Sequence, residues 1–160
     1  MTSREFYLER RRAEQPAFLR VLRALPAKTI AYKPHERSPS AEQLVWTITS
    51  ELRTCLDVVI ENKTDWRQES PPTLRAMVEL FEQWSNDLTD RVAALDDASW
   101  DNTAKFYYEG QLISESPIGQ FLWFIHFDAI HHRGQLAAYL RPMGGTVPSI
   151  YGPSADTRPA

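Results

Sequence analysis

An aspartate and a histidine lie four residues apart in the most apolar segment of the sequence. At this spacing Asp128 and His132 share one face of a helix, because side chains three or four residues apart are neighbours on the helix surface. Glu51 interrupts a second apolar stripe, between Ile48 and Leu52. Two carboxylates and an imidazole form a ligand set for a divalent metal ion, and helical bundle cores commonly hold such sites. The sequence therefore indicates a candidate metal site.

Three further polar residues accompany this candidate site. Thr47 lies one turn before the glutamate, and we expect it beside the site as a group that binds water. Gln135 lies one turn after His132 and is expected to orient its ring, as outer partners of metal ligands do. His131 is a spare ligand. His126 is turned by about 160° from the aspartate around the helix, so we expect it elsewhere.

The same residues also have an ordinary structural interpretation. An aspartate and a histidine four residues apart on a helix often form only a hydrogen bond. Glu51 has alternative partners in Arg133, in His131 and in the arginines of the N-terminal segment. Structural ion pairs of this kind also occur in protein cores, so the residue types and spacing leave both interpretations open.

Four segments with helical periodicity position these side chains, and they predict an all-α four-helix bundle. The segments span residues 4–25, 40–62, 71–95 and 117–140. We expect a kink or restart at Pro16, a capping box from Ser40 to Gln43, and a third helix that starts with Ser70 and Pro71. The fourth segment is apolar on almost every side early on, which is typical of a central helix. The predicted core-facing residues include Leu44, Ile48, Leu52, Phe81, Leu88, Phe121 and Ile125.

The remaining segments are one long crossover connection and a C-terminal tail. Residues 96–115 form the connection, within which residues 105–113 predict a short hairpin or a packed loop. Residues 143–160 form an extended tail that is rich in Pro, Gly and Ser. Extended termini are usually poorly ordered.

Composition narrows the class of protein. The 160 residues predict a single domain over 1–160, and the formal net charge of −3 does not favour binding to nucleic acid. No apolar stretch approaches the roughly 20 residues of a membrane span, and the N-terminus lacks the apolar core of a signal peptide. The single cysteine, Cys55, cannot form an internal disulfide, which favours a cytoplasmic location. Nucleotide-binding glycine motifs and the Gly-x-Ser-x-Gly hydrolase motif are absent from the sequence.

Three stretches of the sequence resemble the DinB/YfiT-like superfamily. Residues 131–141, which read HHRGQLAAYLR, are similar to the motif of its last helix. Residues 144–156, GGTVPSIYGPSAD, resemble its tail, and residues 32–46, YKPHERSPSAEQLVW, resemble its entry into the second helix. The resemblance implies a four-helix bundle that is usually dimeric and holds a divalent metal with three histidines. It also implies that Ile150 and Tyr151 dock on the bundle.

The chain departs from this family pattern at two of the three histidines. His132 matches the histidine before Arg-Gly-Gln, whereas Asp128 and Thr47 stand at the other two positions. Asp128 can still bind a metal, and Glu51, one turn after Thr47, can replace the missing ligand. Such a set is harder than three imidazoles and favours Zn, Ni, Mn or Fe over Cu(I).

Two functions from different classes follow. The first is a homodimeric, metal-dependent enzyme that transfers the sulfur of a low-molecular-weight thiol to a small-molecule substrate, as characterised members of the resembled family do. The second is a degenerate, non-catalytic bundle without metal, in which Asp128 and His132 form a core pair. This bundle would bind a small apolar ligand or a protein partner. Metal analysis separates the two.

Overall fold

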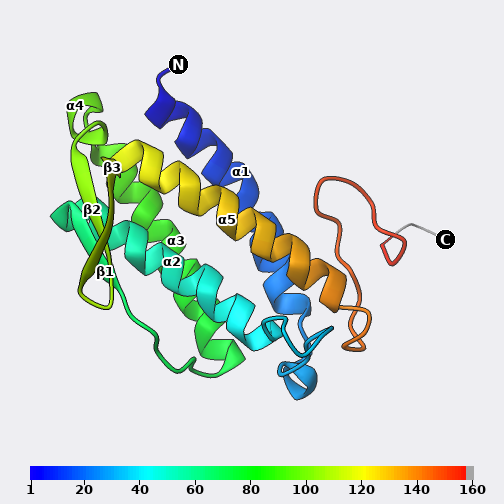
Figure 1. Cartoon of the computed structure of the whole chain (residues 1–160). Coiled ribbons are helices and arrows are strands. Elements are labelled where there is room, and N and C mark those ends of the chain that lie inside the picture. Colours follow the sequence, from blue (N-terminus) through cyan, green and yellow to red (C-terminus); the bar gives the residue numbers. More distant parts are fainter. Residues whose placement is uncertain (158–160) are drawn as a thin grey trace.

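Four long helices form a bundle in the computed structural model, which describes residues 1–157 (Figure 1). The long helices are α1 (Ser3–Ala24), α2 (Ala41–Glu61), α3 (Leu74–Ala94) and α5 (Ile118–Tyr139). Two short elements, η1 (Ala27–Thr29) and α4 (Asp97–Trp100), lie in the connections. Helices α1 and α2 each pack against both α3 and α5. The predicted helical segments are therefore confirmed, and α2 and α5 are direct neighbours.

The helix starts follow local capping rules. The predicted capping box at α2 is present, since Ser40 and Gln43 each accept a hydrogen bond from the other's backbone N–H. The predicted start of α3 is wrong: the Thr73 side chain caps this helix by accepting from the backbone of Ala76. The expected restart at Pro16 is also absent, because α1 is continuous there. The residues that follow the proline pack into the core and hold both halves of α1 in one helix.

The bundle core contains the predicted apolar residues. The buried ones are Leu44, Ile48, Leu52, Phe81, Leu88 and Phe121. Ile125 is only half-buried, and α5 is not covered on all sides, since Phe124 and Phe127 are 66% and 61% exposed. The prediction of a central helix is therefore wrong for α5, because α1 and α2 pack against it and leave its outer face uncovered.

A small three-stranded sheet corrects the prediction of an all-α fold. The strands are β1 (Lys63–Trp66), β2 (Thr103–Tyr108) and β3 (Gln111–Pro117), and the sheet lies beside one end of the bundle (Figure 1). The β2–β3 hairpin lies where a hairpin was predicted, and its two turn residues, Glu109 and Gly110, have positive φ angles of 49° and 82°. Strand β1 pairs in parallel with β2. The sequence patterns did not predict β1, because its partner β2 lies beyond α3 in the sequence.

The C-terminal tail lies against the helices as far as the structure describes it. Arg20 of α1 donates to the carbonyl of Ser149 at 2.8 Å, and the Tyr151 hydroxyl donates to Glu14 at 2.9 Å. Ile150 packs against the core. The predicted docking of Ile150 and Tyr151 is thus confirmed, and residues 158–160 of the predicted tail lie outside the described residues.

Candidate metal centre

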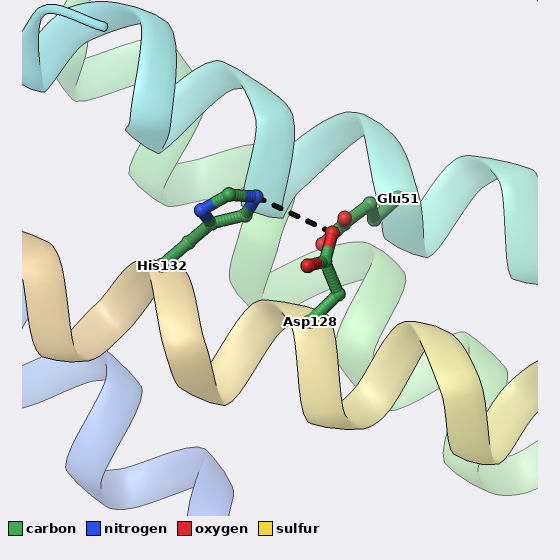
Figure 2. A group of neighbouring side chains, drawn as sticks. All are labelled: Glu51, Asp128 and His132. Atoms are coloured by element: carbon green, nitrogen blue, oxygen red, sulfur yellow. Dashed lines mark ion pairs between the residues drawn. The ribbon is translucent and has the colours of Figure 1, made fainter. Parts of the chain in front are cut away.

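Glu51, Asp128 and His132 converge at the contact between α2 and α5 (Figure 2). Each side chain offers one ligand atom, and these atoms all lie within 4.8 Å of one another. Two of the residues come from successive turns of α5, and the third comes from the facing surface of α2. Tertiary packing therefore joins a local pair to a residue 77 positions earlier in the chain (128 − 51).

Within this group, His132 is oriented from both ring nitrogens. Its Nε2 lies 3.3 Å from Oδ2 of Asp128, and its Nδ1 lies 2.9 Å from Oε1 of Gln135. In the tautomer that carries its proton on Nδ1, the ring donates a hydrogen bond to the amide oxygen of Gln135, and the lone pair of Nε2 is directed at the site. Metal-binding histidines are commonly oriented by such a bond.

Glu51 is the buried member of the group. Its residue is 3% exposed, whereas the side chain of Asp128 is 40% exposed. Burial, together with the hydrogen bond and the negative charge of Asp128, raises the pKa of Glu51 well above the usual value. Its Oε2 atom is buried without a hydrogen-bond partner in the described part of the chain. A proton or a cation between the two carboxyl groups would relieve this repulsion.

The geometry of the group fits a divalent cation. Ligand atoms at about 2.0–2.2 Å from a tetrahedral ion lie about 3.4 Å apart. The separation of 3.3 Å between His132 and Asp128 already matches this value. The ligand atom of Glu51 lies within 4.8 Å of the other two, so the three residues form a group that could hold an ion. Three protein ligands leave a further coordination position for a small molecule.

The other polar residues singled out in the sequence lie in different surroundings. Thr47 is half-buried on the wall of an open groove of about 870 Å³ that also includes Trp46 and Trp66. His131 is exposed, with its ring centre 5.4 Å from that of His132, and is not one of the three converging residues. His126 is buried against Tyr7 of α1, away from the group, as its position on the helix indicated.

A second polar cluster, which sequence reasoning missed, lies between α5, α1 and the tail. Arg133 donates to Glu14 at 2.6 Å, and Tyr151 is hydrogen-bonded to both. Glu14 and Arg133 are both buried. The guanidinium of Arg133 also stacks on Phe18, at 4.6 Å from the ring centre. Arg133 therefore does not pair with Glu51. The sequence does carry a signal for this cluster, because Glu14 is an acidic residue on the apolar stripe of the first helix.

These observations define a class of protein: a helical bundle with a candidate metal site between two of its helices. The sequence model of the DinB family matches residues 1–158, and the chain belongs to this family. No helix in residues 1–157 is both long and apolar enough to cross a membrane.

Solved structures of DinB-like proteins share the fold. One from Bacillus subtilis has a TM-score of 0.69 at 20% identity, covering 95% of this chain and 99% of its own. Another, from Bacillus cereus, has a TM-score of 0.74 at 16% identity, covering 92% of this chain and 97% of its own. No curated protein sequence matches the chain. These similarities establish the fold.

Proposed function

We propose that this protein is a divalent-metal-dependent enzyme whose ion is held by Glu51, Asp128 and His132. The observation that carries the proposal is the convergence of their ligand atoms within 4.8 Å. The carboxylates and the imidazole suit Zn, Ni, Mn or Fe. The buried carboxyl group of Glu51 has an unsatisfied oxygen, which supports the same assignment.

The proposed reaction is the transfer of a low-molecular-weight thiol to a small electrophile. A divalent ion held by these three residues would supply Lewis acidity, which would favour the thiolate form of a bound thiol, with the thiol proton passing to solvent. In the proposed transfer the thiolate sulfur would form a bond to the electrophilic carbon as the bond from that carbon to the leaving group breaks, and the leaving group would depart with the bonding electrons. Gln135 holds the His132 ring in place, and the half-exposed Asp128 leaves the site accessible from solvent.

The protein's own cysteine does not serve as the nucleophile. Cys55 is buried, and burial raises the pKa of its thiol, so that it stays protonated at neutral pH. The sulfur therefore has to come from a separate thiol molecule. The groove walled by Thr47, Trp46 and Trp66 is our candidate for the place where this molecule and its substrate bind, because Thr47 lies one helical turn before Glu51.

Metal analysis of protein purified without a histidine tag tests the proposal. We expect about one bound ion per chain after reconstitution, as in single-site zinc proteins, and none in Asp128→Ala, with both proteins folded by circular dichroism. Asp87→Ala is the matched control, because Asp87 also pairs with a basic residue four positions on, Arg91 in α3. It should retain the metal. Absence of metal from the reconstituted wild type would contradict the proposal.

A non-catalytic binding protein is the alternative function. One observation favours it: an apolar groove of about 530 Å³ between α1 and α5, lined in part by Phe6, Trp123, Phe127 and Ile130. In this case Asp128 and His132 form only a hydrogen-bonded pair, and the groove takes a small apolar ligand or a protein partner. A metal-free wild type that binds an apolar dye, with loss of binding in Phe127→Ser, would support this alternative.

We further propose a homodimer formed through the outer face of α5. Its support is the exposure of Phe124 and Phe127, at 66% and 61%, on one helix. Twofold dimers are the commonest closed assemblies. Light scattering at micromolar concentration should give twice the 18.4 kDa mass of one chain, and Phe124→Asp should shift it towards the monomer. A monomeric wild type would contradict this assembly.

We also propose that residues 1–160 form one domain that acts in the cytoplasm. The DinB family match over residues 1–158 supports a single domain, as do the contacts of the tail with α1. The buried free thiol of Cys55 fits a reducing compartment.

A further inference from the structure

A small cavity shares one residue, Glu51, with the candidate metal centre. Its volume is about 20 Å³, which is room for one or two water molecules. Glu51 of α2 forms part of the wall, Tyr7 and Arg11 of α1 form another part, and His126 of α5 completes it. His126, which the helix geometry turns away from Asp128, therefore lines the same cavity as Glu51.

Two unsatisfied polar atoms belong to the walls of this cavity. Oε2 of Glu51 and Nε2 of His126 are both buried without a hydrogen-bond partner in residues 1–157. The two residues are 3% and 6% exposed, so bulk water does not satisfy these atoms. Leaving a buried polar atom unpaired is unfavourable, and such atoms usually have an ordered water as partner.

We propose that His126 is a positioning residue for Glu51 and acts through a water molecule held in this cavity. The proposal rests on the proposed function, since it concerns how one ligand of the metal is oriented. The water donates one hydrogen to Oε2 of Glu51 and the other to Nε2 of His126. Tyr7 and Arg11, on the same walls, carry N–H and O–H donors for the water oxygen.

The surroundings of His126 suit this arrangement. An imidazole has two ring nitrogens, and Nε2 of His126 is the one that is buried with no hydrogen-bond partner within residues 1–157. The His126 ring packs edge-on against Tyr7, with ring centres 5.8 Å apart. A carboxylate held by such an outer partner is preorganised for metal binding.

A crystal structure of the metal-free full-length protein tests the water directly. We expect one ordered water in the cavity, within 3.2 Å of both Glu51 Oε2 and His126 Nε2, the upper limit for a hydrogen bond. A cavity that is empty, or a water that contacts only one of the two atoms, would overturn the proposal. This readout does not depend on whether the protein binds metal.

Zinc affinity tests the effect on Glu51. The dissociation constant for Zn²⁺, measured by competition with a chromophoric chelator, should rise about 10–100-fold in His126→Phe. His126→Gln, which keeps a polar end group, should recover part of the loss. Phe81→Leu changes the same cavity wall without removing a polar atom, so it should lower the melting temperature and leave the zinc affinity unchanged.

The outcomes separate this proposal from the proposed function. An unchanged zinc affinity in His126→Phe, or a loss as large in Phe81→Leu, would overturn the positioning role while leaving the metal centre intact. A wild type that binds no zinc would contradict the metal centre, and with it the positioning role. The crystal structure would then still decide whether a water joins Glu51 to His126.

Discussion

Two buried glutamates lie on opposite sides of α5 in contrasting electrostatic surroundings. Glu14 of α1 and Glu51 of α2 are 5% and 3% exposed. Burial alone raises the pKa of Glu14, but the hydrogen bonds from Arg133 and Tyr151 and the charge of Arg133 outweigh it and lower the pKa. Glu51 instead lies beside the carboxyl group of Asp128, and burial together with this neighbour raises the pKa of Glu51.

This difference separates a structural site from a candidate functional site. Glu14 already has its cation, in a hydrogen-bonded pair that joins the tail to two helices. Glu51 lies beside Asp128 and has a buried oxygen with no partner within residues 1–157. A buried carboxyl group without a basic partner, such as Glu51, is a candidate for binding a cation. A buried carboxylate that is paired with a basic side chain, such as Glu14, contributes to the stability of the fold.

The largest expected effect comes from breaking the structural cluster. Arg133→Met keeps much of the side-chain volume but leaves Glu14 with only the half-exposed Arg10, 3.7 Å away, as a cation, so the free energy of unfolding should fall by about 3 kcal/mol. Urea denaturation of the metal-free protein measures this change. The double variant Glu14→Gln/Arg133→Met should recover a large part of it, because neither charge is then buried alone. No recovery would show that Arg133 acts through packing on Phe18 instead.

A smaller effect is expected where the tail meets the same cluster. Tyr151→Phe removes the hydroxyl that bonds to Glu14 and Arg133 while keeping the ring. Since Tyr151 is 73% exposed, water replaces part of these bonds, and we expect a loss of about 1 kcal/mol in urea denaturation. Zinc binding should not change, because the tyrosine is not part of the metal group. A large drop in zinc affinity would show that the two clusters are coupled.

The smallest effect, and one of opposite sign, is expected at the candidate metal centre. Without metal, the raised pKa of Glu51 means that the folded chain holds a proton that the unfolded chain releases above about pH 4.3. This contribution to stability is complete below that pH and is lost as the pH rises through the folded pKa. Glu51→Gln should therefore gain stability relative to the wild type between about pH 5 and pH 8.

Urea denaturation in EDTA at several pH values measures this trend, and Glu14→Gln is its matched control. The pKa of Glu14 is lowered, so its contribution is present above the ordinary glutamate value and lost as the pH falls through the folded pKa. Glu14→Gln should therefore be less stable than the wild type by a constant amount above about pH 5, and this deficit should shrink as the pH falls below about 4. Parallel pH profiles for the two variants would contradict the contrast between the glutamates.

Local sequence features determined much of the fold. Helical periodicity gave all four long helices, and the capping box at Ser40 and Gln43 gave the start of α2. The relation between Asp128 and His132 follows from the helix repeat alone, as does the contact of Gln135 with His132. These features depend on residues three or four positions apart, where the backbone geometry leaves few alternatives.

Tertiary structure alone decided the partners of residues far apart in the chain. Arg133 was one candidate partner for Glu51, yet it pairs with Glu14, 119 residues away. Strand β1 pairs with β2 across the whole of α3, and His126 shares a cavity wall with Glu51. Helix periodicity fixes which way a side chain points from its own axis. Which helix it then faces depends on how the apolar surfaces of all four helices pack together, and no local pattern in the sequence encodes that packing.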